Sequence, residues 1–264
     1  MKLKNRSFLA ILFFSIFVLS CGGKGGDDGP DPITWEEVQQ SFSELDFSPG
    51  VKDHSIEVAA NVFWTFRLVV PELETGETAP LFIDMHGESG GAANAHQFSY
   101  DCYLKNGLAG LKAFMIIPNA GQEQWYDQNN QIQIQGLISL AKDYLSVDPN
   151  KVVAMGYSNG GNATWLFTEN APQLFSAGIA MASSYSMQNQ DGSFRKINVP
   201  LYVIHGSDDQ LFPIATTKAW VDGSIEAGSD ITFVEATGLG HYEPCNYVPY
   251  VEDAITWLQT TVWN

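Results

Sequence analysis

Apolar segments of five to seven residues recur along the chain from residue 55 onward, with turn-forming residues between them. The later segments are almost entirely apolar, which is typical of strands buried on both faces of a sheet. Eight segments are therefore predicted as strands: residues 55–59, 65–70, 81–86, 113–118, 151–157, 177–183, 201–206 and 231–236.

Stretches with the apolar spacing of helices alternate with these strands. The predicted helices are a short surface helix over residues 35–47 and longer ones over 134–145, 162–170, 215–227 and 251–262. This alternation predicts the α/β class, with a mostly parallel central sheet that helices cover on both faces. In such a sheet the functional loops follow the carboxyl ends of the strands.

The first 20 residues have the pattern of a secretory signal peptide. Three basic residues precede an apolar run from Phe8 to Ser20, which is shorter than the roughly 20 residues that a membrane-spanning helix needs. The residues Val18-Leu19-Ser20-Cys21 resemble a bacterial lipobox, which implies that Cys21 carries lipid. The alternative is an ordinary signal peptide followed by an incidental cysteine.

Residues 21–34 are rich in glycine and aspartate and are predicted to form a flexible tether, which leaves residues 35–264 as a single domain. We therefore expect an extracytoplasmic protein, periplasmic or at the cell surface, that meets the bacterial membrane only through its lipid anchor. In that oxidising setting Cys102 and Cys245 form either a disulfide or two buried free thiols.

Composition and charge limit the classes of molecule that the protein can bind. The chain has 264 residues, of which 45% are apolar, and this excludes intrinsic disorder. Its formal charge is −17, and loss of residues 1–20 leaves 10 basic against 30 acidic side chains, a charge of −20. Nucleic acid is therefore excluded as a partner, and polyanionic substrates are disfavoured relative to neutral ones.

The most specific motif is Gly156-Tyr157-Ser158-Asn159-Gly160, which lies between an apolar strand and a predicted helix. It fits the nucleophile elbow, in which a strained turn presents a serine hydroxyl and neighbouring glycines avoid collisions. Ser158 is thus the candidate nucleophile. The alternative is a glycine-rich turn in which Ser158 only caps the helix.

A serine hydroxyl needs a base to accept its proton, and the base needs an acid that orients it. His241 is the predicted base because it lies in a glycine-rich loop after the last strand. Asp208 and Asp209 both follow the strand 201–206. The spacing H-G-x-x-D-x-x-x-P resembles the acid loop of α/β-hydrolases, which implies that Asp209 is the acid, with Asp208 as the alternative. The order serine, aspartate, histidine is that of α/β-hydrolases.

Two backbone N–H groups are expected to bind the oxyanion of the tetrahedral intermediate. One belongs to Asn159, directly after the nucleophile, and the other to Glu88 in the glycine-rich loop after the strand 81–86, with Gly87 as the alternative donor. A carboxylate disfavours an adjacent developing anion. We therefore expect the Glu88 side chain to point away from the site or to pair with a cation.

The motifs HGESGGAANA, PNAGQEQWYD, DPNKVVAMGYSNGG, HGSDDQLFP and GLGH together resemble the polyhydroxybutyrate-depolymerase and feruloyl-esterase group of secreted α/β-hydrolases. The resemblance spans roughly residues 60–260 and implies that Trp125 lies near the substrate cleft, with a core aromatic as the alternative. The chain departs from the group at Glu88, where the group often has cysteine, and at Asn119-Ala120-Gly121, where it often has Pro-Asp-Gly.

The connection from Ser184 to Pro200 is too short for a large helical lid, so the cleft is expected to be open. Aromatic rings suit sugar rings and aromatic acids alike. Trp125 and Tyr157 are the predicted substrate-binding residues among six candidate rim aromatics: Trp125, Tyr126, Tyr157, Tyr185, Phe212 and Tyr242.

These observations predict a serine carboxylic-ester hydrolase that acts through an acyl-enzyme. The expected substrates are soluble or polysaccharide-linked esters of acetyl, feruloyl or short hydroxyalkanoate type. The mechanism requires no metal and no organic cofactor. Two alternatives stay open, namely a serine peptidase of the same fold and a catalytically silent, surface-tethered module that binds glycans.

Overall fold

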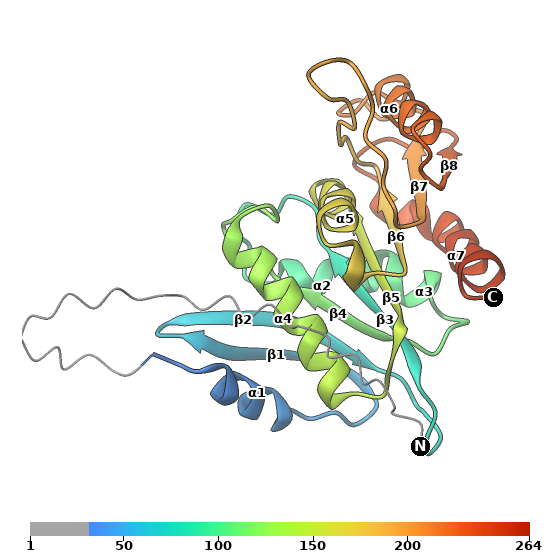
Figure 1. Ribbon diagram of the computed structural model, residues 1–264. Coiled ribbons are helices and arrows are strands. Elements are labelled where there is room, and N and C mark those ends of the chain that lie inside the picture. The colour runs from blue at the N-terminus through green and yellow to red at the C-terminus, as the bar shows by residue number, and fades with distance from the viewer. Residues whose placement is uncertain (1–31) are drawn as a thin grey trace, which may run out of the picture. The chain divides into compact units, whose positions relative to one another are not determined.

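An eight-stranded sheet forms the centre of the computed structural model, which describes residues 32–264 (Figure 1). The strand order is β1-β2-β4-β3-β5-β6-β7-β8. The strands are β1 (Gly50–Ala59), β2 (Val62–Val70), β3 (Ala79–Met85), β4 (Phe114–Pro118), β5 (Val147–Tyr157), β6 (Ala177–Met181), β7 (Leu201–Gly206) and β8 (Ile231–Ala236).

Only the β1 end of the sheet is antiparallel. β1 pairs antiparallel with β2, and β2 pairs antiparallel with β4, whereas all other neighbours run parallel. The predicted mostly parallel sheet is therefore confirmed. The predicted signal peptide, Cys21 and most of the predicted tether lie outside the described residues.

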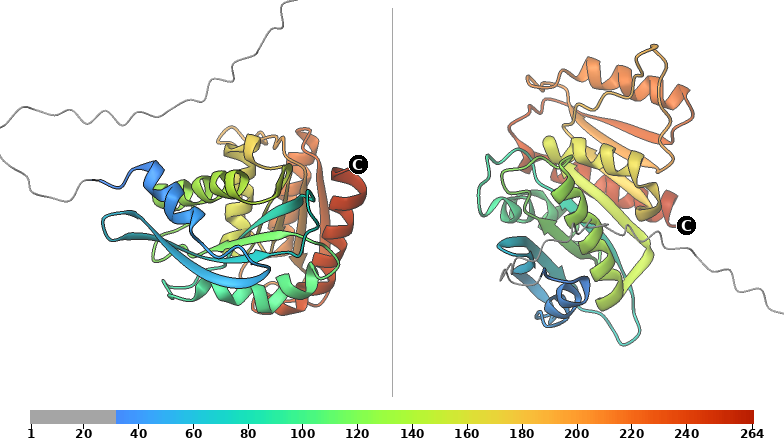
Figure 2. Two further views of the ribbon diagram at one scale, coloured as in Figure 1. Left: turned by 90° about the horizontal axis from the view of Figure 1, so that it is seen from below. Right: turned by 60° about the vertical axis from the view of Figure 1, so that its left-hand side comes forward.

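Helices cover both faces of the sheet, as Figures 1 and 2 show. The helices are α1 (Trp35–Ser43), α2 (Ala95–Ser99), α3 (Lys105–Gly107), α4 (Gln128–Tyr144), α5 (Asn159–Asn170), α6 (Ile214–Glu226) and α7 (Val248–Trp257). Two π-helical segments, η1 (Tyr100–Leu104) and η4 (Leu258–Val262), and two short 3-10 helices, η2 (Pro172–Leu174) and η3 (Pro244–Tyr247), complete the elements.

Two apolar cores result from the alternation of side chains along each strand. In β3, Leu81 and Ile83 face the core that α1, α4, α5 and α6 cover, and Phe82 faces the core that η1, α7 and η4 cover. Every residue of β3 is buried. The continuous apolar runs in the sequence have this physical origin, because a strand with helices on both faces exposes neither side to water.

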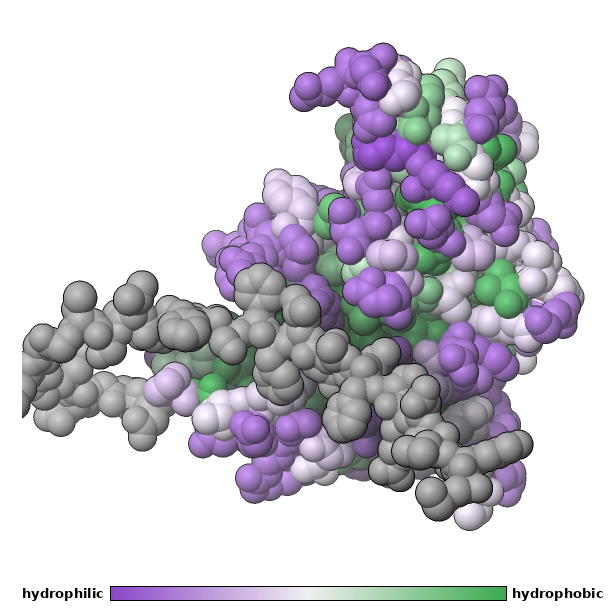
Figure 3. Space-filling view, viewed as in Figure 1, coloured by the Kyte–Doolittle hydropathy of each residue, from purple (hydrophilic) through white to green (hydrophobic). Residues whose placement is uncertain are grey.

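The connection between β6 and β7 contains no helix within the described chain, and its residues 182–200 form only an isolated bridge between Gln188 and Phe194. The prediction that no large lid covers the site is therefore confirmed. Within residues 32–264, no helix is both long and apolar enough to cross a membrane. Hydrophilic residues predominate on the face shown in Figure 3, as the acidic composition implies.

Candidate active site

Ser158 occupies a strained turn between β5 and α5. Its φ angle is +56°, a backbone conformation that side-chain-bearing residues rarely adopt. The turn is possible because Gly160 has no side chain. A Cβ atom there would collide with the carbonyl oxygen of Met85 at the end of β3. The serine N–H donates to the carbonyl oxygen of Met181 at 2.9 Å, which fixes the turn on the neighbouring strand. The hydroxyl is thus presented where a nucleophile elbow presents it.

The structure brings the three predicted catalytic side chains together from distant parts of the chain. Ser158 Oγ lies 2.9 Å from His241 Nε2, and His241 Nδ1 lies 2.8 Å from Asp209 Oδ2. The side chains of His241 and Asp209 are both buried. This arrangement lets the imidazole accept the serine proton at Nε2 while the aspartate stabilises the imidazolium through Nδ1–H.

Backbone N–H groups orient Asp209, the predicted acid, toward His241. Asp209 Oδ1 accepts from the N–H groups of Leu211 at 2.9 Å and Phe212 at 2.7 Å, so the other oxygen is aimed at His241. Asp208 is exposed, and its carboxylate accepts from the hydroxyl of Ser207. The choice of Asp209 over Asp208 thus agrees with the geometry.

His205, at the end of β7, braces the aspartate loop. Its Nε2–H donates to the carbonyl oxygen of Phe212 at 2.7 Å, and the same nitrogen lies 3.5 Å from Asp209 Oδ2. The side chain is fully buried, and this burial lowers the pKa of His205. The ring is therefore neutral near pH 7 and acts as a fixed donor rather than as a second base.

Tyr157 holds the histidine loop. Its hydroxyl donates to the carbonyl oxygen of His241 at 2.5 Å, and burial raises the pKa of this phenol, so the hydroxyl keeps its proton. The ring of Tyr157 also lines the pocket beside Ser158. Tyr157 was predicted to bind substrate, and the structure shows the additional contact with the backbone of the base.

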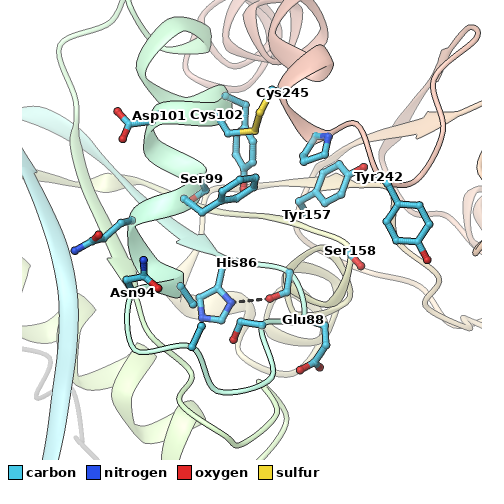
Figure 4. Close-up of a pocket in the computed structure, with 18 of the residues that line it drawn as sticks. His86, Glu88, Asn94, Ser99, Asp101, Cys102, Tyr157, Ser158, Tyr242 and Cys245 are labelled. Carbon is cyan, nitrogen blue, oxygen red and sulfur yellow. Dashed lines mark hydrogen bonds between the residues drawn. A yellow bond between two sulfur atoms is a disulfide. The ribbon is translucent and has the colours of Figure 1, made fainter.

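A disulfide joins Cys102 in η1 to Cys245 in η3, across 143 residues of sequence. This finding decides between the two alternatives that the sequence left open. Cys245 lies four residues after His241, and both cysteines line the pocket. The bond therefore ties the segment that carries the base to the helical wall opposite it (Figure 4).

His86, which follows β3, orients the loop that carries the predicted donor Glu88, named here the oxyanion loop. Its Nδ1–H donates to the carbonyl oxygen of Gly87 at 2.6 Å, and its Nε2 accepts from the N–H of Ala120 at 3.1 Å. Burial lowers the pKa of His86, so the ring is neutral. In a trans peptide the N–H points opposite to the carbonyl, so the Glu88 N–H is directed away from the His86 ring.

Asn159 supplies the second predicted oxyanion donor. It is the first residue of α5, so its N–H has no acceptor within the helix and lies at the positive end of the helix dipole. Gly87 lies against the nucleophile, because a Cβ atom there would be 3.4 Å from Ser158 Cβ. The two loops that carry the predicted donors therefore meet at Ser158.

The Glu88 carboxylate turns away from Ser158, as Figure 4 shows. Its Oε1 accepts from the N–H of Gly90 at 3.0 Å, and its Oε2 accepts from Gln124 Nε2 at 3.0 Å. The hydrogen bond from Gln124, followed by that from Gly90, lowers the pKa of Glu88. Of the two expectations for this side chain, the structure shows the outward direction, with neutral donors in place of a cation.

Trp125 lies beneath the oxyanion loop, not at the wall of the large pocket. Its side chain is 1% exposed, its Nε1–H donates to the carbonyl oxygen of His86 at 2.9 Å, and its ring packs edge-on against His86. A ring buried to this extent offers little surface to a substrate, and the alternative of a core aromatic fits this burial. A role of Trp125 in substrate binding stays a prediction.

A pocket of about 980 Å³ opens beside Ser158 and His241 and extends toward α2 and η1 (Figure 4). Its walls include Phe98, Tyr157 and Tyr242 together with the disulfide. Of the described residues that line it, none is a lysine or an arginine. Phe98 is 59% exposed and was not predicted, because the motif HGESGGAANA ends at residue 95, before it.

The other candidate aromatics lie elsewhere. Trp125, Tyr126 and Tyr185 border a smaller depression of about 220 Å³ next to α5. Phe212 packs edge-on against the His241 ring with centroids 4.9 Å apart, so it supports the base. Of the six predicted rim aromatics, only Tyr157 and Tyr242 line the large pocket.

A buried acid lies under the floor of the pocket. Asp84 in β3 is fully buried, and burial raises its pKa to about 7. The hydroxyl of Tyr103, which lines the pocket, donates to Asp84 Oδ1 at 3.0 Å. A carboxyl group in this setting keeps its proton below about pH 7 because ionisation there would leave a charge in an apolar surrounding.

Comparisons with known proteins agree with this architecture. The model of the prolyl oligopeptidase family matches residues 118–198, which include the nucleophile elbow. No curated protein sequence matches the chain.

Solved structures give the wider likeness. A thermostable esterase is 20% identical with a TM-score of 0.64, over 79% of this chain and 62% of its own. An esterase from the planctomycete Thermogutta terrifontis is 17% identical with a TM-score of 0.61, over 80% of this chain and 92% of its own. An acylaminoacyl peptidase is 12% identical with a TM-score of 0.57, over 80% of this chain and 41% of its own.

The chain thus spans less than two thirds of the length of the first esterase and of the peptidase. The strand order, the elbow and these likenesses together show that the chain has the α/β-hydrolase fold, and its triad has the arrangement of a serine hydrolase.

Proposed function

We propose that the protein is a serine hydrolase that cleaves carboxylic esters through an acyl-enzyme. The observation that carries this proposal is the continuous hydrogen-bonded series from Ser158 Oγ through His241 to Asp209, at 2.9 and 2.8 Å. It is assembled from the ends of β5, β7 and β8, where an α/β sheet places its functional loops.

The reaction has two steps, acylation of Ser158 and hydrolysis of the acyl-enzyme, and His241 carries the proton in both. Ser158 Oγ attacks the ester carbonyl while its proton passes to His241 Nε2, and the oxyanion forms near the N–H groups of Glu88 and Asn159. His241 then protonates the leaving alcohol oxygen, and the C–O bond to it breaks. In the second step, a water molecule gives a proton to His241 and attacks the acyl carbon, and the proton returns to Ser158 as the acid leaves.

The pocket disfavours anionic substrates. Its described lining has exposed aromatic rings and no lysine or arginine, and the mature chain would carry a charge of −20. A carboxylate on the substrate would find no cationic partner there. With the motif resemblance, this favours acetyl, feruloyl or short hydroxyalkanoate esters, either soluble or linked to polysaccharide.

A peptidase activity is the second candidate, because the family model that matches residues 118–198 is that of prolyl oligopeptidases. The same triad can cleave an amide, in which case the leaving group is an amine. Rates on p-nitrophenyl acetate and on a peptide p-nitroanilide distinguish the two. We expect hydrolysis of the ester and little or none of the anilide.

The direct test uses the mature chain and its Ser158→Ala variant. The variant is expected to lose at least about 10⁴-fold in kcat/KM on p-nitrophenyl acetate, because the nucleophile and its activation are lost together. A fluorophosphonate probe is expected to label the wild type and not the variant. Failure of the wild type to react with the probe would instead favour the silent glycan-binding module.

For the location, we propose that the protein is exported and anchored through lipid on Cys21. The support is the basic start, the short apolar run and the lipobox-like residues before Cys21. The expressed full chain should partition into the detergent phase of Triton X-114 and incorporate labelled palmitate. Cys21→Ala should do neither, and an unchanged detergent partition of the variant would contradict the anchor.

A further inference from the structure

We infer that Gln124 is a positioning residue that holds together the two loops that supply the oxyanion donors. The inference rests on the proposed function, because it concerns how the oxyanion site of that reaction is kept in shape. Gln124 belongs to the motif PNAGQEQWYD in the loop before α4, but no role was predicted for it.

The side chain of Gln124 bridges the side chains of both predicted donors. Its Oε1 accepts from Asn159 Nδ2 at 2.6 Å, and its Nε2 donates to Glu88 Oε2 at 3.0 Å. Asn159 Nδ2 also lies 3.4 Å from the same Glu88 oxygen, which closes a three-membered network. One amide therefore connects the loop after β3 with the start of α5.

Gln124 is itself held by the start of α4. Its backbone N–H donates to Asp127 Oδ2 at 2.8 Å, and its carbonyl oxygen accepts from Asn130 Nδ2 at 3.0 Å. Asn130 is a buried residue of α4, and it also donates to the carbonyl oxygen of Ala120. The bridging amide is thus supported by a helix rather than by a free loop.

The bridge is needed because the donors belong to different segments. Glu88 lies in an exposed loop in which Gly90 and Gly91 have φ angles of +58° and +80°, whereas Asn159 begins a helix packed on the sheet. An oxyanion donor must keep its place to within about 0.5 Å to be effective. His86 fixes the Gly87 carbonyl, and Gln124 fixes the adjacent residue relative to Asn159.

The bridge also keeps the negative charge of Glu88 away from the developing oxyanion. The Gln124 amide and the Gly90 N–H together hold the carboxylate of Glu88 in its outward direction. Without the amide, the carboxylate would keep only the Gly90 N–H and the longer contact with Asn159 Nδ2, and a turn toward the oxyanion would place its charge where it raises the barrier. Gln124 therefore acts on the transition state through Glu88 and not by touching substrate.

A charge swap tests the inference. Gln124→Glu places a second carboxylate opposite Glu88, so we expect kcat on p-nitrophenyl acetate to fall about 10- to 100-fold with KM changed less than about threefold, since an oxyanion contact is made mainly in the transition state. Adding Glu88→Gln restores an amide–carboxylate pair with its polarity reversed. The double variant is expected to recover to within about fivefold of wild type.

Gln128→Glu is the matched control, because it adds the same charge at an exposed position four residues further along the chain and should keep wild-type kcat. All variants are compared by circular dichroism and thermal melting. Wild-type kcat in Gln124→Glu, or a loss that Glu88→Gln does not recover in a folded double variant, overturns the inference. Failure of the proposed function is separate, because then the wild type itself would not react with a fluorophosphonate.

Discussion

Two groups of residues surround Ser158, and they are built differently. The acid–base group consists of His241 and Asp209, which are buried, with exposed fractions of 4% and 6%. The oxyanion group, Glu88, Asn159 and Gln124, has exposed or half-buried side chains joined to one another by hydrogen bonds. The comparison shows that one active site uses burial for its charged pair and a polar network at the surface for its neutral donors.

The physical reason lies in what each group does. The imidazolium–aspartate pair is strongest where water is excluded, so its carboxylate is satisfied by two backbone N–H groups and braced by His205. The oxyanion donors are main-chain groups whose position matters more than their burial, and side chains in contact with solvent suffice to hold them. Loss of a contact should therefore cost more in the acid–base group.

Among the tests of this comparison, the largest effect is expected from Asp209→Asn. The amide cannot stabilise the imidazolium and favours the wrong tautomer, so kcat should fall about 10³- to 10⁴-fold. Asp208→Asn is the matched control and should stay within about twofold of wild type, because Asp208 does not reach His241. Equal losses in both variants on p-nitrophenyl acetate would contradict the assignment of the acid.

Removal of the disulfide, by Cys102→Ser with Cys245→Ser, tests whether the acid–base group depends on the link to η1. The free energy of unfolding should fall by about 2–5 kcal/mol, because the bond closes a loop of 143 residues. Activity should fall as well, since Cys245 follows His241 by four residues. Urea unfolding and kcat of the wild type are measured with and without reductant. If the reductant changes neither the free energy of unfolding nor kcat, the acid–base group does not depend on the disulfide.

Asp84 under the pocket floor predicts a pH-dependent stability. Its pKa is raised from 3.8 to about 7 in the fold, so the folded state binds the proton more tightly than the unfolded state. Between these values stability should fall as the pH rises, by up to about 4 kcal/mol.

Asp84→Asn removes this titration while keeping an acceptor for Tyr103. The free energy of unfolding of the variant should not fall between about pH 4 and pH 7 through this group, and the variant should be more stable than the wild type above pH 7. Urea midpoints from pH 4.5 to 8 check this, and parallel curves for the two proteins would disprove it.

The smallest effect is expected from Tyr157→Phe, which sharpens the role of that ring. The variant keeps the ring in the pocket and removes the hydrogen bond to the carbonyl oxygen of His241, so kcat should fall about three- to tenfold, or about 1 kcal/mol. KM for a bulky aromatic ester should stay the same. A change confined to KM would show that the hydroxyl contacts substrate instead.

Much of the site was predictable because its signals are local. The elbow around Ser158 needs glycines within a few residues, and the acid and base follow apolar strands whose ends are visible in the pattern. The burial of Trp125 and the contacts of Phe98 and Gln124 were not predicted, because they depend on neighbours far along the chain. An aromatic residue after a strand looks the same whether it faces solvent or, like Trp125, donates to the backbone of a loop beneath the surface.

The sequence alone determined the alternation of strands and helices, the elbow and the order of the triad, because periodicity and backbone constraints act over short distances. The tertiary structure alone decided that Cys102 and Cys245 are bonded, that Trp125 is buried and that Gln124 joins Glu88 to Asn159. Those features are contacts between segments that only the closed fold brings within a few ångströms of each other, and no local pattern records them.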